Sequence, residues 1–117
     1  MKIIYKNNKV EKQCNNLKEA KKSFGRYGED VIACKNLLES MGSFSDVMNY
    51  PPLHCHKLKG EMKNMWGIDV KSRKCSLRIV IAPLDEKGKK VLADSNFAIT
   101  CKELKVVLIE EVGNHYE

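Results

Sequence analysis

The sequence lacks any apolar run that approaches the roughly 18 residues needed to span a membrane. Its opening segment, Met1 to Lys6, holds only three apolar residues between two lysines, which is too few for the apolar core of a secretory signal. The hydrophobic share of 43% and the charged share of 31% are typical of globular proteins in water. These features predict a cytoplasmic protein with no membrane partner.

Common catalytic motifs are also missing. The sequence has no phosphate-binding glycine loop, no nucleophile elbow and no H-E-x-x-H pattern, which argues against nucleotide hydrolases, serine hydrolases and zinc proteases. It contains no linker rich in proline or glycine and no internal repeat. With 117 residues, the chain is therefore expected to form one domain, residues 1–117.

Cysteine is present in an odd number and without a C-x-x-C pair, which predicts reduced, buried thiols. The five cysteines are Cys14, Cys34, Cys55, Cys75 and Cys101. The triplet His54-Cys55-His56 contains possible metal ligands, but neighbouring residues of a strand point to opposite faces. No second compact pair completes a tetrahedral set, although Cys75 or Cys101 could be brought near by the fold. We expect no metal and no other cofactor.

Positive charge is in excess and unevenly placed. The formal net charge is +6, and residues 1–74 carry 15 Lys and Arg against 8 Asp and Glu, whereas the remainder carries 6 against 7. Such an excess attracts phosphate backbones and acidic proteins without specifying either. A solvated, lysine-rich surface that only aids solubility explains the same numbers equally well.

The first third of the chain has the periodicity of helices after one short strand. Residues 2–5 alternate weakly and predict a strand. Asn8 with Glu11 has the spacing of a capping box, and an apolar stripe then continues as far as Phe24, before Gly25. A second helix is predicted over about residues 29–41. Together they predict an antiparallel helical pair.

The remaining two thirds are dominated by strands. Pro51 and Pro52 predict an extended, non-helical stretch. Strands are predicted at residues 66–71, 77–82 and 105–110, with a short one at 56–58, a hairpin turn at 72–76 and another turn at 85–88. Thr100 with Glu103 predicts a one-turn helix within an otherwise irregular region. The fold class predicted is α+β, with two N-terminal helices packed on a mainly antiparallel sheet of four to five strands.

Residues able to carry chemistry gather near the predicted strand ends. If the segment after His54 is extended, His56 and Leu58 point to one face, and Lys57 and Lys59 point to the other. For a single polar residue, a structural role is the commoner outcome: Arg78 could pair with Asp69 or Glu110.

Four ordered blocks of the second half resemble the HigB-like branch (plasmid maintenance system killer proteins) of the RelE/ParE toxin superfamily. They are Leu53-His-Cys-His-Lys-Leu-Lys-Gly60, Trp66-Gly-Ile-Asp-Val70, Leu77-Arg-Ile-Val-Ile81 and Ile109-Glu-Glu-Val-Gly-Asn-His115. Members of that branch carry L-K-G, W-x-I-x-V, Y-R-I-x-F and a terminal E-I-V-D-Y-H in the same order. The chain departs from the last block, where Gly113 and Asn114 replace Asp and Tyr.

The resemblance implies the toxin of a type II toxin–antitoxin pair, a metal-independent endoribonuclease that cleaves mRNA at the ribosome. Its partners would be mRNA, the ribosome and a cognate antitoxin of the helix-turn-helix kind. Residue by residue, it implies catalytic roles for His56, Lys59, Arg78 and His115. Histidines exchange protons near neutral pH, and the cationic side chains can bind phosphate oxygens. RNA contacts are predicted for Lys57, Lys63, Asn114 and Tyr116.

Two other functions fit the same sequence. A ParE-like protein would inhibit DNA gyrase by binding, without cutting nucleic acid, although the His-x-x-Lys spacing and the terminal histidine favour cleavage. A catalytically inactive toxin-like protein that binds an antitoxin is favoured by Gly113 and Asn114.

Overall fold

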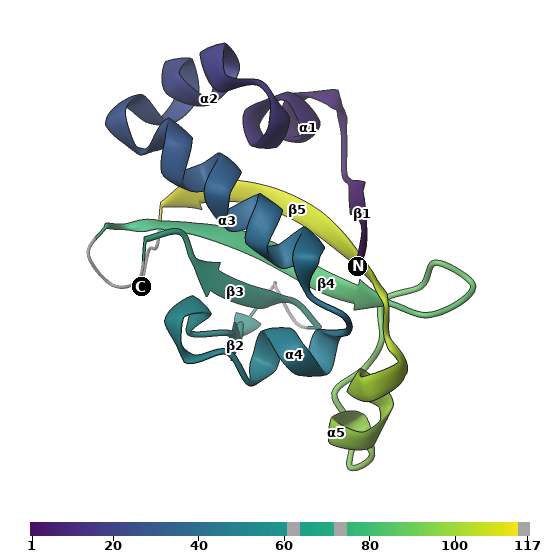
Figure 1. Ribbon diagram of the computed structural model, residues 1–117. Helices are drawn as coiled ribbons and strands as arrows, with labels where there is room; N and C mark the ends of the chain where they lie inside the picture. Colours follow the sequence, from purple (N-terminus) through teal and green to yellow (C-terminus); the bar gives the residue numbers. More distant parts are fainter. Residues whose placement is uncertain (61–63, 72–74, 115–117) are drawn as a thin grey trace.

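The computed structural model describes residues 1–60, 64–71 and 75–114, and these form helices packed against a five-stranded sheet. The strands are β1 (Lys2–Tyr5), β2 (His56–Lys57), β3 (Trp66–Asp69), β4 (Leu77–Leu84) and β5 (Val106–Asn114). Their order is β1-β5-β4-β3-β2, with β1 parallel to β5 and every other pair antiparallel (Figure 1). The predicted α+β class is confirmed.

The helical layer consists of α1 (Asn8–Asn15), α2 (Leu17–Phe24) and α3 (Gly28–Ser40), which lie together on one side of the sheet (Figure 1). A short 3-10 helix, η1 (Gly25–Tyr27), links α2 to α3. The prediction of one unbroken first helix is wrong, because Asn16 is extended and its side chain accepts a hydrogen bond from the Glu19 amide, so it ends α1 and caps α2.

The cap of α1 also differs from the prediction. Asn7, rather than Asn8, accepts the hydrogen bond from the Val10 amide through its side-chain oxygen, so the helix begins one residue after its cap. The predicted stop at Gly25 is confirmed, since this residue has φ +60° where α2 ends.

Shorter helices lie in the connections from α3 to β2 and from β4 to β5: α4 (Phe44–Met48), η2 (Pro51–Leu53), α5 (Phe97–Thr100) and η4 (Cys101–Glu103). The predicted extended stretch at Pro51-Pro52 is wrong, because both prolines occupy the first positions of the 3-10 helix η2, where no amide donor is required. The predicted one-turn helix after Thr100 is confirmed as η4, but Thr100 does not cap it with its side chain. Thr100 ends α5, and its hydroxyl donates to the carbonyl of Asn96, four residues earlier.

The core lies between the helices and one face of the sheet. This helix face presents the side chains of Ile68, Ile79, Ile81, Val107 and Ile109, all fully buried. Phe44 and Phe97 reach the same face and surround Trp66, with the rings of Trp66 and Phe97 stacked 5.3 Å apart. The other side of the sheet, called the second face below, contributes none of these residues.

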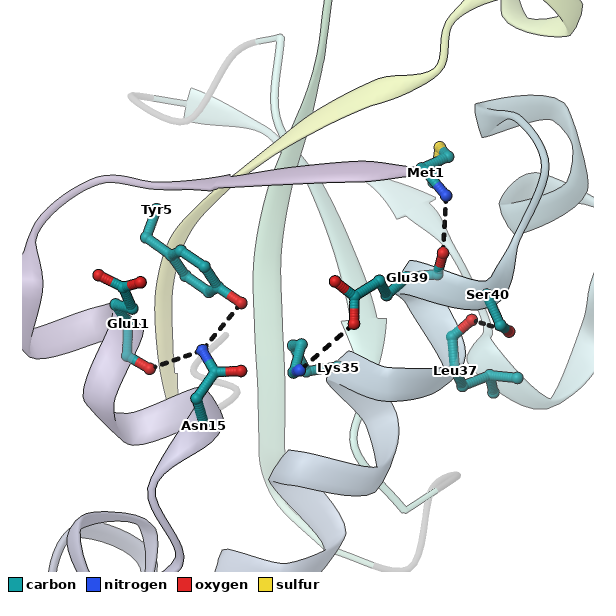
Figure 2. A network of polar contacts seen from close by, with 8 residues as sticks. All are labelled: Met1, Tyr5, Glu11, Asn15, Lys35, Leu37, Glu39 and Ser40. Atoms are coloured by element: carbon teal, nitrogen blue, oxygen red, sulfur yellow. Dashed lines mark hydrogen bonds and ion pairs between the residues drawn. The ribbon is translucent and has the colours of Figure 1, made fainter.

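Polar contacts fix β1 to the helical layer (Figure 2). The Met1 ammonium donates to the carbonyls of Glu39 and Met41, both at 2.6 Å, and so places a positive charge at the end of α3, whose last turn has no basic residue. Asn15 donates to the Tyr5 hydroxyl at 2.9 Å. The buried Lys35 pairs with Glu39 at 3.5 Å.

No helix in the described ranges is long and apolar enough to cross a membrane.

Candidate functional site

The register of the sheet brings His56 and Arg78 to the second face. His56 lies opposite Gly67, which lies opposite Val80, and Arg78 is two residues away from Val80 along β4. Directly paired residues share a face, and residues two apart on a strand do so too. The two side chains therefore leave the same face, with their backbones about 10 Å apart across the strands and about 7 Å apart along them.

The His56 imidazole has a defined position and tautomer. Its Nδ1 atom lies 2.9 Å from the His54 carbonyl oxygen, which can only accept, so Nδ1 carries the proton and the neutral ring has its lone pair on Nε2. A left-handed backbone at His54, with φ +46°, directs this carbonyl. The ring then lies over Gly67, where an added Cβ would come within 3.2 Å of Cε1 and 3.3 Å of Nε2.

Leu58 shares this face, as the sequence predicted. The same hypothetical Cβ on Gly67 would lie 3.3 Å from Leu58 Cδ2, so His56 and Leu58 are confirmed to project together. Lys57 pairs with Trp66, a helix-face residue, and therefore points away from His56. Lys57 and Lys59 are both exposed and line a hollow of about 470 Å³ that includes Gly60 and Asn64. The predicted RNA contact Lys57 thus lies beside His56 in sequence but on the other side of the strand.

Arg78 lies between an acidic residue and a glycine. Its cross-strand neighbours are Asp69 on β3 and Gly113 on β5. Among the residues that the structure describes, Arg78 forms no ion pair with Asp69, and Glu110 is paired with two lysines instead. The structural role predicted for Arg78 with Glu110 is wrong. Of the described atoms, only Glu111 Oε2 lies within 4 Å of a Cβ added on Gly113, at 3.9 Å.

Four predicted site residues remain. The structure describes the position of Asn114 and does not describe Lys63, His115 and Tyr116. Asn114 ends β5 and its side-chain oxygen accepts a hydrogen bond from Ser76 at 3.2 Å. It pairs with Leu77 and so belongs to the helix-face side of the strand, opposite in facing to Arg78. Lys63, His115 and Tyr116 lie outside the described residues.

An acidic centre on β5 was missed by sequence reasoning. Glu110 is the extra residue of a β-bulge, since Val80 pairs with Glu111 and Ile81 with Ile109. Its carboxylate, only 10% exposed, lies 2.6 Å from Lys6 Nζ and 3.5 Å from Lys90 Nζ. Burial alone would raise the pKa of Glu110, but the contacts with Lys6 and Lys90 outweigh it and hold the pKa below its usual value.

The thiols do not contribute a nucleophile to this face. All five cysteines are free, with Cys14, Cys34 and Cys101 buried and Cys55 and Cys75 half-buried, so the expected reduced thiols are confirmed and their burial is confirmed for three. Burial raises the pKa of Cys34 and of Cys55 to about 12, which keeps both protonated at neutral pH.

In the part of the chain that the structure describes, no group of three His, Cys, Asp or Glu side chains is arranged to hold a metal.

Comparison with known proteins gives no match to a family model, to a characterised protein or to a solved structure. The resemblance to HigB-like toxins therefore rests on the four sequence blocks alone.

Proposed function

We propose that the protein is a metal-independent endoribonuclease that cleaves single-stranded RNA at the second face, in keeping with a toxin of the RelE/HigB kind. One observation carries the proposal: the His56 imidazole, positioned by its Nδ1 contact with the His54 carbonyl, shares a sheet face with Arg78, which forms no ion pair among the described residues. A base and a phosphate-binding cation are the two groups that 2′-hydroxyl attack requires.

The chemistry follows from the positions of these groups. His56 Nε2 accepts the proton of a ribose 2′-hydroxyl, and the 2′-oxygen attacks the adjacent phosphorus. The bond from phosphorus to the 5′-oxygen breaks, and this oxygen takes a proton from a second acid, the role predicted for His115. The products are a 2′,3′-cyclic phosphate and a 5′-hydroxyl. Arg78 stabilises the extra negative charge on the phosphorane through its forked donors.

Gly67 suits this use of the face. Having no side chain, it allows the imidazole to lie close to β3, where an added Cβ would come within 3.2 Å of the ring. The substrate proposed is mRNA at the ribosome, and the protein partner proposed is a cognate antitoxin that covers the protein's basic face. Both come from the resemblance to the toxin family.

The test is cleavage of a defined single-stranded RNA by the purified protein in the presence of a chelator. We expect cleavage that stops when the scissile nucleotide is 2′-deoxy. His56→Ala is expected to lower the rate by about 10²- to 10⁴-fold and Arg78→Ala by about 10²- to 10³-fold. Lys22→Ala, which removes an exposed positive charge from α2, is the control and should cleave normally.

The competing functions give different results. If both variants cleave as fast as the parent, the assignment of the site is wrong. If induction in cells leaves message intact while DNA supercoiling fails, a gyrase-binding protein replaces the proposal. If neither message nor supercoiling changes, the protein is an inactive toxin-like binder.

A further inference from the structure

A cavity of about 370 Å³ opens where α3 and η2 meet the end of β3. Its walls are apolar and include Leu37, Leu53 and Val70. Two exposed side chains of different character also line it: Tyr50, which is 39% exposed, and Lys71. Cavities of this size and composition are typical of sites for small planar ligands.

The cavity exists because β2 is short. Among the residues that the structure describes, β2 pairs only with Trp66 and Gly67, and no described strand lies beside the edge of β3 beyond Gly67. The chain before β2 turns instead through the prolines of η2, which places Tyr50 and Leu53 against this edge. On the other side, Cys34 of α3 donates to the Asp69 carbonyl at 3.6 Å and holds the helix at a fixed distance.

The cavity is one strand away from Arg78. Asp69 contributes to its lining, and Asp69 is also the residue of β3 that lies directly opposite Arg78. Residues paired across an antiparallel ladder have Cα atoms about 5 Å apart. Successive phosphates of a single strand are separated by a distance of this order, so a strand bound at Arg78 on the second face reaches the edge of β3 within one or two nucleotides. It must then pass around that edge to enter the cavity, which α3, Leu53 and Val70 place on the helix side of the sheet.

We propose that this cavity binds the base of a nucleotide a few positions from the cleaved bond, with the base against the Tyr50 ring and the phosphate of that nucleotide on Lys71. The inference rests on the proposed RNA cleavage and adds a base-binding subsite to it. Apolar walls and an exposed aromatic ring fit a stacked base, and the adjacent cation complements a phosphate. An uncharged apolar ligand would make no use of Lys71.

The experiment measures binding of a short RNA whose scissile nucleotide is 2′-deoxy, so that affinity is read without cleavage. Tyr50→Ala removes the stacking ring and is expected to weaken binding by about 5- to 150-fold. Ala33→Leu fills the cavity from an exposed position of α3 and is expected to weaken binding as well. Ala98→Leu, at an exposed helical alanine of α5, and Lys22→Ala are the controls and should bind like the parent.

The outcomes separate this inference from the proposed function. If Tyr50→Ala and Ala33→Leu keep the parent's affinity and melting temperature, the subsite does not exist. If they bind RNA normally but no longer bind a partner protein that the parent binds, the cavity is a protein-docking site and the inference is likewise overturned. If they lose RNA affinity while no form of the protein cleaves RNA, the subsite stands and the proposed cleavage fails.

Discussion

At the scale of single residues, two glycines of the second face differ in what an added side chain would contact. Gly67 and Gly113 flank the central strand, one beneath the His56 ring and one beside Arg78, yet they differ in the space around them. A side chain at Gly67 would press on the imidazole and on Leu58, whereas a side chain at Gly113 would meet a single carboxylate oxygen at ordinary contact distance. The pair therefore offers a matched test of the position of His56.

Gly67→Ala is expected to slow RNA cleavage by about 10²-fold, because an added Cβ at 3.2 Å must displace the ring that acts as base. Gly113→Ala should change the rate by less than about threefold. The measurement is the single-turnover cleavage rate of each variant, with the melting temperature recorded beside it. Equal rates for Gly67→Ala and the parent would show that the ring position is irrelevant to catalysis.

Local sequence patterns predict which way a side chain faces better than they predict its ion-pair partners. Alternation along the segment at 56–59 was enough to place His56 and Leu58 together, because the two-residue period of a strand is set by the backbone. The partner of Glu110 was not predictable in this way. Lys6 and Lys90 come from distant parts of the chain, and only the parallel pairing of β1 with β5 brings Lys6 to the bulge.

At the scale of elements, the packing of α2 against α3 depends on Gly28. An added Cβ there would lie 2.7 Å from the Ala20 carbonyl carbon and 2.7 Å from the Lys21 nitrogen, both backbone atoms of α2. This contact could not be predicted from the sequence, because a glycine at the start of a helix does not by itself indicate close packing. The break at Asn16 was hidden for a similar reason, since the apolar stripe continues across it in sequence.

Gly28→Ala is expected to lower the free energy of unfolding by about 3 kcal/mol, since the backbones of two helices must separate to admit the methyl group. Chemical denaturation of the variant and the parent measures the difference. Gly113→Ala is the control, with an expected change within about 0.5 kcal/mol. If both substitutions cost the same, close packing at Gly28 does not hold the helical layer together.

At the scale of the whole molecule, Glu110 connects three separate parts of the chain. Lys6 follows β1, Glu110 lies in the bulge of β5, and Lys90 belongs to the loop after β4. Asp85 shapes that loop by accepting from the amides of Lys87 and Lys89. One largely buried carboxylate thus joins the edge strand, the sheet interior and the loop, and its charge state affects how they hold together.

The ion pairs of Glu110 should make the free energy of unfolding fall as the pH is lowered. The pKa of Glu110 in the folded protein lies below its ordinary value, so its contribution is complete above about pH 4.3, the value for an unfolded chain, and disappears as the pH falls through the lower folded value. Glu110→Gln is expected to cost about 1 kcal/mol at pH 7, because Lys6 is well exposed and water partly screens the pair. Its difference from the parent should shrink below about pH 4.

Glu111→Gln removes the same charge from the neighbouring, exposed position and serves as the control, with an expected change within about 0.5 kcal/mol across the pH range. Denaturation curves at several pH values compare the two variants with the parent. A constant deficit for Glu110→Gln down to pH 3 would mean that packing of the side chain, and not its charge, joins β1 to the bulge. A deficit that closes on acidification assigns the connection to the two lysines.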